Sequence, residues 1–392
     1  MLRWSMRSRA ALIMAMFLAV FAVGTGAGHA SPTGGPLSTA KVDCVTFNTT
    51  TNTCELVGVV YAMAQIGDRT YIGGSFTAVS GQPRANLAAI RGDGTVDPTW
   101  TPTTDGIVYA LAPSSDGTKV FVGGTFATIN GTARRLAAVT ADTGALVPGW
   151  TTTTSNNTVR ALVADAADRL YVGGNFSRIG GKAITRLAAV SQSTGAVDAA
   201  FAPTPNNTVR ALALSDDGSD LYAGGSFTSI GGQSRPGAAE LAPTTGAVTS
   251  FAPTEGGVAI SMDVSPTGRL FFGTTNNRTF AYDPGGDNAP EYRVRTSGDV
   301  QAILATETEV YVGGHFSGFP EAKINRLHIA SFNAADGSVT AWDPGANGSY
   351  GVWAFGLTRT ALSPAQPHHL SVGGDFTRVA NVARRGYARW AL

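Results

Sequence analysis

The chain has 392 residues, of which 43% are hydrophobic and only 14% charged, and its 28 basic side chains nearly balance its 27 acidic ones. A nearly neutral chain lacks the basic surface that nucleic-acid binding requires, so nucleic acid is excluded as a partner. The length exceeds the roughly 250–300 residues at which a single hydrophobic core stops growing. The chain therefore holds either two domains or a repeat array.

The first thirty residues have the features of a secretory signal peptide. Three arginines precede an apolar run at residues 10–23, and Gly28 and Ala30 supply the small residues that favour cleavage before Ser31. The run is shorter than the ~20 residues of a membrane-spanning helix, and no later segment resembles one. We expect cleavage after Ala30, secretion, and a flexible segment at residues 31–41. An uncleaved N-terminal anchor is the alternative.

Two cysteines follow, Cys44 and Cys54. In an exported protein, a single pair at such close spacing is typical of a structural disulfide rather than of a metal site. We therefore predict a Cys44–Cys54 disulfide, with two free thiols as the alternative.

A strand pattern then recurs seven times at a spacing of roughly fifty residues. Each copy opens with a strand of the form V-x-A followed by a large apolar residue, and the fifth copy, at residues 259–262, departs furthest from it. The second strand ends in Gly-Gly-x-Phe in six copies, as in Gly73–Phe76. Adjacent glycines inside a strand indicate a bulge or a close backbone approach. We interpret them as the tight contact between neighbouring units near a common axis.

The third strand of a copy is typically L-A-A-V or L-A-A-I, and the fourth is short and ends at an aromatic residue. These closing aromatics are Phe47, Trp100, Trp150, Phe201, Phe251, Tyr292 and Trp342. Four short strands in a fixed period of about 40–50 residues are typical of a β-propeller. We expect an all-β protein in which residues 42–392 form a single seven-bladed β-propeller with four-stranded blades.

The last copy lacks its fourth strand, because the chain continues only to the third, at residues 387–392. Residues 42–52 loosely resemble a fourth strand with its exit loop, as found at residues 96–106. We therefore predict that Val42–Phe47 pairs with Tyr387–Ala391 and completes blade seven. Such pairing would close the ring and leave no exposed sheet edge at the junction.

The full repeat, from V-x-A-L through Gly-Gly-x-Phe and R-L-A-A-V to the closing aromatic, resembles the delta-60 repeats of secreted bacterial β-propellers. The resemblance extends over residues 42–392 and is weakest in the fifth copy. It implies the propeller fold and adds little about function, because a fold alone does not select between binding and catalysis.

One rim of the predicted ring is the candidate site. Side chains that differ from copy to copy lie there, near the start of the first strands: Tyr61, Tyr109, Arg160, Arg210 and Trp353. Guanidinium groups mixed with Tyr and Trp favour an interface hot spot or an acidic or sugar-like ligand. The nearby loop arginines recur in six copies, at Arg84, Arg135, Arg186, Arg235, Arg326 and Arg385. We interpret these as structural, each bonding to carbonyl groups of the next blade.

A second candidate is the fifth copy, where Gly273–Asn277 replaces Gly-Gly-x-Phe and the following loop is short. This departure indicates either a groove across the face or decay of the repeat. The histidines are scattered and no catalytic motif stands out, so we predict no metal, no cofactor and no catalytic residues.

The leading hypothesis is a secreted, monomeric binding module for an unknown extracellular protein or glycan. The alternative is an extracellular hydrolase or lyase with its site at the mouth of the central channel. A purely structural surface protein is a third option.

Overall fold

The computed structural model describes residues 31–48, 53–155, 157–283, 285–358 and 369–392, and the backbone alone of residues 46–48 and 53–57. The predicted signal peptide and the side chain of Cys54 lie outside this part, so cleavage and the disulfide stay predictions. Every element of the described residues is a β-strand, as expected for an all-β chain. None of these residues belongs to a helix that is long and apolar enough to cross a membrane.

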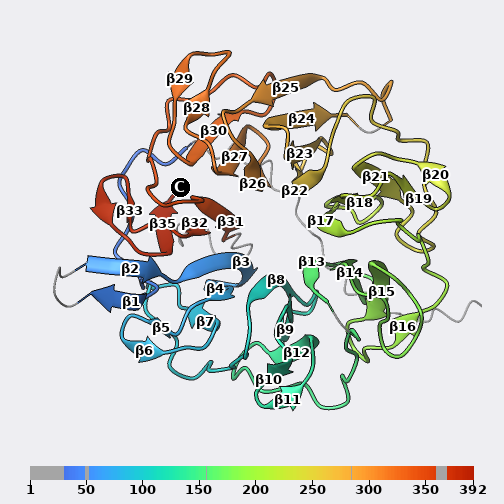
Figure 1. The fold of residues 1–392 in the computed structure, drawn as a ribbon, viewed down its shortest axis with the longest axis horizontal. Helices are drawn as coiled ribbons and strands as arrows, with labels where there is room; N and C mark the ends of the chain where they lie inside the picture. Colours follow the sequence, from blue (N-terminus) through green and yellow to red (C-terminus); the bar gives the residue numbers. More distant parts are fainter. Residues whose placement is uncertain (1–30, 49–52, 156, 284, 359–368) are drawn as a thin grey trace, which may run out of the picture.

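In the described part of the chain, seven antiparallel sheets of three or four strands stand side by side in a ring (Figure 1). We number them sheets 1 to 7 in chain order. In each sheet the first strand lies nearest the centre of the ring, the second strand pairs with it, and the third pairs with the second. The first strand of every sheet contacts that of the next, and β31 of sheet 7 contacts β3 of sheet 1, so the described sheets form a closed circle.

The first strands are β3 (Val59–Ile66), β8 (Val108–Pro113), β13 (Val159–Ala164), β17 (Val209–Leu214), β22 (Ala259–Val264), β26 (Val300–Ala305) and β31 (Val352–Leu357). The second strands are β4 (Arg69–Ser75), β9 (Lys119–Gly124), β14 (Arg169–Gly174), β18 (Leu221–Gly225), β23 (Leu270–Thr274), β27 (Glu309–Gly314) and β32 (His369–Gly374). The third strands are β7 (Leu87–Ile90), β12 (Leu136–Thr140), β15 (Leu187–Ser191), β21 (Ala238–Leu241), β24 (Arg278–Tyr282), β30 (Ile329–Asn333) and β35 (Tyr387–Ala391).

The fourth position of a sheet is only lightly paired. Sheets 3 and 5 have a regular fourth strand, β16 (Val197–Asp198) and β25 (Tyr292–Arg295). In sheets 1, 2, 4 and 6 the corresponding segment makes a single β-bridge to the third strand, as Val96 does to Ile90. Small two-stranded hairpins lie between the second and third strands of five sheets. They are β5 (Ala78–Val79) with β6 (Gln82–Pro83), β10 (Thr128–Ile129) with β11 (Thr132–Ala133), β19 (Ser229–Ile230) with β20 (Gln233–Ser234), β28 (Gly318–Phe319) with β29 (Ile324–Asn325), and β33 (Arg378–Val379) with β34 (Val382–Ala383).

The glycine pairs explain how closely the sheets approach one another. A Cβ atom on Gly123 would lie 2.4 Å from Val159 Cγ1 in the next sheet, and one on Gly373 of sheet 7 would lie 2.6 Å from Val60 Cγ1 of sheet 1. The second glycine faces its own sheet instead, because a Cβ on Gly74 would lie 1.9 Å from the carbonyl oxygen of Val59. The interpretation of these glycines as packing residues is confirmed, since a side chain at either position overlaps a neighbour.

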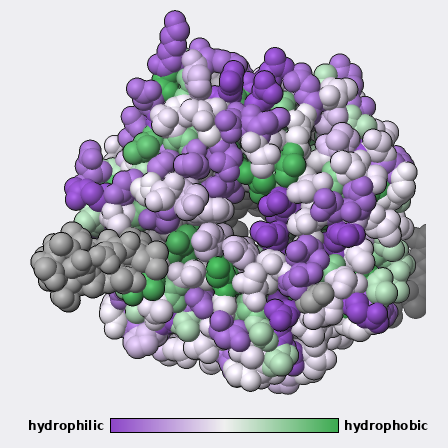
Figure 2. All heavy atoms as spheres, viewed as in Figure 1, coloured by the Kyte–Doolittle hydropathy of each residue, from purple (hydrophilic) through white to green (hydrophobic). Residues whose placement is uncertain are grey.

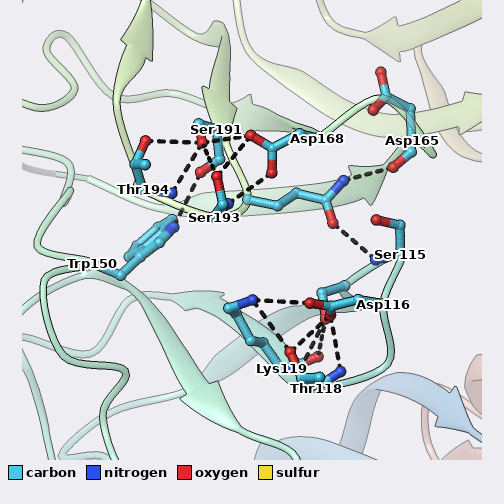
Figure 3. Close-up of polar contacts among 12 residues, drawn as sticks. Ser115, Asp116, Thr118, Lys119, Trp150, Asp165, Asp168, Ser191, Ser193 and Thr194 are labelled. Atoms are coloured by element: carbon cyan, nitrogen blue, oxygen red, sulfur yellow. Dashed lines mark hydrogen bonds and ion pairs between the residues drawn. The ribbon is translucent and has the colours of Figure 1, made fainter.

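Two of the closing aromatics, Trp100 and Trp150, each join their sheet to the next. The indole nitrogen of Trp100 donates a hydrogen bond to the carbonyl of Thr140 (3.0 Å), and that of Trp150 donates to the carbonyl of Ser191 (3.1 Å, Figure 3). Gln192 adds a second link between sheets 2 and 3. Its amide oxygen accepts from the backbone of Ser115 and its amide nitrogen donates to the carbonyl of Asp165 (2.8 and 2.6 Å). Trp100 and Trp150 therefore have a structural role.

The predicted pairing of Val42–Phe47 with Tyr387–Ala391 is wrong. Instead, β1 (Cys44–Asn48) pairs with β2 (Thr53–Val57) in an antiparallel hairpin at the side of the ring (Figure 1). The two segments are neighbours in the chain, and pairing them closes only a short loop, which costs less entropy than pairing distant ends.

The ring is nevertheless joined by the N-terminal segment, a few residues earlier than predicted. The backbone N–H of Leu37 donates to the carbonyl of Arg389 in β35 (2.7 Å), just as that of Asp97 donates to Ala89 in sheet 1 (2.8 Å). The side chain of Arg384 reaches the carbonyl of Leu37 (3.2 Å). Residues 36–42 thus occupy the outer position of sheet 7.

Candidate functional site

A cavity of about 460 Å³ lies on the ring axis, where the first strands of all seven sheets converge. Figure 2 shows an opening in the middle of the molecule, with strongly hydrophilic residues gathered along the side formed by sheets 3 and 4. The wall is built in three layers by consecutive residues of the first strands. The outermost layer consists of Tyr61, Tyr109, Arg160, Arg210, Ile260, Gln301 and Trp353. Small residues, alanine in six sheets and Ser261 in the seventh, form the second layer, and large apolar residues such as Met63 and Leu162 form the third.

Every residue of the outermost layer is the extra residue of a β-bulge. In sheet 1, Val60 pairs with Gly74 and Ala62 with Gly73, so Tyr61 between them has no partner on the second strand. The same shift occurs in the six other first strands. A bulge redirects the side chain of its unpaired residue. The repeated backbone therefore presents seven equivalent positions to the axis, and the chain fills them with different chemistry.

The structure brings all five predicted site residues together in this layer. The rings of Tyr61 and Trp353 meet edge to face with centroids 5.1 Å apart, and Tyr61 and Tyr109 are tilted by 49° at 5.2 Å. The guanidinium carbon of Arg160 lies 5.5 Å from the centre of the Tyr109 ring, a cation–π contact. Burial raises the pKa of the Tyr61 phenol to about 12, and the neighbouring Tyr109 adds to the shift. These contacts form a continuous arc of aromatic and cationic side chains.

The two arginines of this arc have little to neutralise them. No described acidic side chain forms a salt bridge with Arg160 or Arg210. The Nε atom of Arg160 is buried without a hydrogen-bond partner, and Arg210 Nε donates to the hydroxyl of Ser226 (2.9 Å). Burial lowers the pKa of the Arg210 guanidinium, and the positive charge of Arg160 lowers it further. The pair is thus a partly desolvated, uncompensated concentration of positive charge.

The other side of the cavity is polar. Gln301 donates to Asp299 (3.3 Å), and its own amide oxygen is buried without a partner. His315 Nδ1 lies 3.9 Å from Asp299 Oδ1, too far for a hydrogen bond. Thr275 of the fifth sheet also lines the cavity. This side therefore offers donors and acceptors for hydroxyl or amide groups.

Sequence reasoning missed Asp299, His315, Tyr350 and Asp375. Tyr350 is 56% exposed and its ring lies 6.3 Å from that of Trp353 and 5.8 Å from that of His315. Asp375 accepts backbone hydrogen bonds from residues 349–351, at 2.7–3.0 Å, and so fixes the loop that carries Tyr350. His315 and Asp375 both stand at the variable position of Gly-Gly-x-Phe. The sequence contained a signal for His315 and Asp375, because the residue at their position changes from copy to copy, as the five predicted residues do.

Two of the loop arginines, Arg84 and Arg235, are structural, but their partners differ from those predicted. Arg84 donates to the carbonyl of Asp97 (2.9 Å), and Arg235 donates to those of Phe251 and Thr249 (2.9 and 2.8 Å). These carbonyls belong to the outer segment of the same sheet and not to the next sheet. Arg84 and Arg235 therefore hold the lightly paired fourth position of sheets 1 and 4 in place. Arg186 instead donates to the carbonyl of Pro205, in the connection to sheet 4 (3.0 Å).

The fifth sheet has the tight turn expected from its sequence. β23 and β24 are joined through Asn277, which adopts a positive φ of 64°. The amide of Asn276 donates to the carbonyl of Gly256 (3.0 Å) and anchors the turn beside the cavity. The part of the chain that the structure describes contains no group of three or more His, Cys, Asp or Glu side chains that could hold a metal ion.

Comparisons with known proteins identify the fold. The family model described as "Domain of unknown function (DUF5122) beta-propeller" matches residues 68–99. No curated protein matches the sequence. Among solved structures, the WD40 β-propeller domain of Doa1 is similar with a TM-score of 0.58 and 10% sequence identity, over 92% of this chain and 97% of that one. This likeness concerns the fold alone. The chain is thus an all-β protein with the fold of a β-propeller.

Proposed function

We propose that this protein is a secreted β-propeller that binds an extracellular protein or glycan in its axial cavity. The seven sheets would be the blades of a seven-bladed, delta-60-type propeller, with the lightly paired outer segments as fourth strands. Residues 36–392 would form the single domain, beginning slightly earlier than the predicted residue 42. Secretion rests on the predicted signal peptide, and a monomer is expected because the ring closes on itself.

The observation that carries the proposal is the variety of side chains at equivalent bulge positions. A packing role would favour one residue type at these positions, as in the layer beneath, where six of the seven residues are alanine. Instead, the cavity holds an aromatic arc, two arginines and a polar side opposite them. Concave sites with aromatic walls and a few placed polar groups are typical of ligand binding.

The test is a screen of the mature protein against glycan arrays and extracellular proteins, with Tyr109→Ala and Trp353→Ala run in parallel. Binding by the wild type that both variants lose supports the proposal. Ligands that bind the variants equally well would contradict it and move the site away from the cavity. Circular dichroism of both variants verifies that the sheets are intact.

A hydrolase or lyase is the second candidate, favoured by one observation. His315 and Asp299 form a potential acid–base pair beside the cavity, and catalytic contacts are commonly long without substrate. Their 3.9 Å separation is too long for a hydrogen bond, which makes binding the better supported function. Product formation from a bound glycan that His315→Ala abolishes, with binding retained, would instead establish an enzyme.

A further inference from the structure

The charge in the cavity points to the class of ligand. Arg160 and Arg210 occupy adjacent positions in neighbouring sheets, and no described acid pairs with either. Two like charges in a partly desolvated site repel each other, and the site is stabilised when an anion lies between them. The planar guanidinium group fits a carboxylate through two parallel hydrogen bonds.

The aromatic arc next to the arginines adds a second requirement. In the edge-to-face contact of Tyr61 with Trp353, one ring presents only its edge and keeps its faces free of that partner. The tilted contact of Tyr61 with Tyr109 likewise differs from a face-to-face stack. Flat apolar surface beside a cationic pair suits a ligand with a ring that carries a negative group. A sugar ring has apolar C–H faces for such a surface.

The remaining walls favour a sugar over an acidic peptide. Beneath the outermost layer the cavity is lined by alanine and large apolar residues, with Ser261 as the polar exception. A peptide would bring backbone amide groups into this region, where they would lose hydrogen bonds to water. The hydroxyls of a sugar lie at its periphery, and Gln301, Asp299 and Thr275 in the cavity wall are suitable hydrogen-bond partners for them. A cavity of about 460 Å³ is also of the size that holds a small ligand.

We propose that the axial cavity binds a uronic-acid unit of an acidic glycan. Its carboxylate lies between Arg160 and Arg210, and its ring packs on Tyr61, Tyr109 or Trp353. This inference rests on the proposed binding function and adds the ligand class to it.

Isothermal titration calorimetry with three probes tests the inference: a galacturonate or glucuronate oligosaccharide, the neutral oligosaccharide of the same linkage, and a hexapeptide of glutamate. The uronate oligosaccharide is expected to bind at least about tenfold more tightly than the neutral one, since a hydrogen bond to a charged group contributes about 1.5–3 kcal/mol. Arg160→Ala and Arg210→Ala should each lower its affinity by a similar factor. Arg178→Ala, on the outside of the same sheet as Arg160, is the matched control and should bind as the wild type does.

Three outcomes would overturn the uronate assignment: equal affinity for the neutral sugar, no binding of any uronate oligosaccharide, or tighter binding of the peptide. In each case the proposed function still stands if another ligand binds and Trp353→Ala abolishes its binding. If Trp353→Ala leaves the binding of every ligand unchanged, the proposed function fails as well.

A second inference concerns Ser31, which contacts Glu309 in sheet 6. The backbone N–H of Ser31 donates to Glu309 Oε1 at 2.9 Å, and its hydroxyl donates to the other oxygen of the same carboxylate. The Ser31 hydroxyl also lies 3.0 Å from that of Ser331, which is fully buried in β30. No described lysine or arginine forms a salt bridge with Glu309.

Ser31 is also the residue that cleavage after Ala30 would make the first of the mature chain. Its nitrogen would then be an α-ammonium group, because α-amino groups have a pKa of about 7.7–8.0 in peptides. The hydrogen bond to Glu309 would become a charge-assisted one, which is roughly twice as strong as a neutral one. From Ser31 the segment continues along sheet 7 through Leu37 and reaches sheet 1, where Ala40 donates to the carbonyl of Gly94 (2.8 Å).

We propose that removal of the signal peptide creates an ion pair between the new N-terminus and Glu309. This pair fastens the segment that joins sheets 6, 7 and 1, so processing and ring closure are linked. The proposal rests on the predicted cleavage site and is independent of the ligand.

Mass spectrometry of the secreted protein is the first test, and an N-terminus other than Ser31 overturns the proposal. The second compares the chain that starts at Ser31 with one that retains Ala30, which moves the charge by one residue. The longer chain is expected to melt about 1–3 °C lower. Glu309→Gln should abolish this difference, and Glu307→Gln, on an exposed neighbour, should leave it intact. Equal melting temperatures, or a difference that persists in Glu309→Gln, would contradict the ion pair.

Discussion

The molecule contains two groups of arginines that differ in how completely they are bonded. Arg84 and Arg235, in the loops between second and third strands, are buried and donate to several carbonyls of their own sheet. Arg160 and Arg210, at the axis, are half-buried, and the hydrogen bond of Arg210 to Ser226 is the one such contact that the described residues give this pair. The loop arginines recur from copy to copy, whereas the axial ones occupy positions that elsewhere hold Tyr, Trp, Gln or Ile.

This difference separates structural from functional residues in a repeat protein. A residue that meets the same backbone demand in every copy must recur, because the demand recurs with the fold. A residue that recognises a ligand has no reason to recur, since the ligand does not share the symmetry of the ring. Variation at an equivalent position is therefore the useful signal for binding.

The largest expected effect tests this difference directly. Arg235→Ala leaves the carbonyls of Phe251 and Thr249 without their donors and should lower the free energy of unfolding by about 2–4 kcal/mol. Arg210→Ala should change it by less than about 1 kcal/mol, because the loss of one hydrogen bond is offset by relief of the repulsion from Arg160. Urea denaturation of both variants measures the two values. Equal losses would mean that the axial arginines are structural too.

A smaller effect is expected at the glycines where neighbouring sheets meet. Gly123→Ala would place a Cβ 2.4 Å from Val159 Cγ1, and the resulting overpacking should cost about 1–3 kcal/mol. Gly256→Ala is the matched control, since its Cβ would meet no atom closer than 3.7 Å and its φ is not positive. Thermal denaturation distinguishes the two. If Gly123→Ala is as stable as the control, the sheets are not packed to this limit.

Residues 36–42, the closing segment, should be sensitive to substitution, although they do not match the repeat. Val42 is fully buried, so Val42→Ala should cost about 1–2 kcal/mol through lost burial and the cavity left behind. Val45→Ala, at an exposed site in the hairpin strand β1, should have little effect. If Val45→Ala lowers stability more than Val42→Ala does, the result would support the originally predicted pairing of residues 42–47 with β35.

The period, the strand order and the packing glycines could be predicted from sequence, because each makes the same physical demand in every copy. The closing segment could not. Residues 36–42 are held by a few backbone hydrogen bonds and by the burial of Ala40 and Val42, which is too short a segment to show a repeat pattern. A chance similarity between residues 42–47 and a true fourth strand favoured the wrong segment.

Only part of the site could be predicted from the sequence, namely the residues that vary within an otherwise repeated strand. Tyr61, Arg160 and the other variable residues of the first strand were identified because they broke a pattern. His315 and Asp375 break the Gly-Gly-x-Phe pattern in the same way but were included in a motif interpreted as packing. The ring contacts of Tyr350 with His315 and Trp353, which arise only from the fold, show that His315 lies beside the predicted residues.

The smallest expected effect is the alkaline titration of Tyr61. Burial raises the pKa of its phenol to about 12 from an ordinary value of 10.0, so the folded protein keeps this proton at a pH where the unfolded chain has lost it. The stabilisation is therefore complete below pH 10 and declines as the pH rises from 10 towards 12. Tyr61→Phe should remove this part of the decline, and the difference between the two chains in denaturation at pH 9 and pH 11 measures it. If a bound acidic glycan covers Tyr61, it should delay the ionisation further, because it adds both burial and negative charge beside the phenol. A titration unchanged by a saturating ligand would place that ligand away from the aromatic arc, even if the arginines were shown to hold its carboxylate.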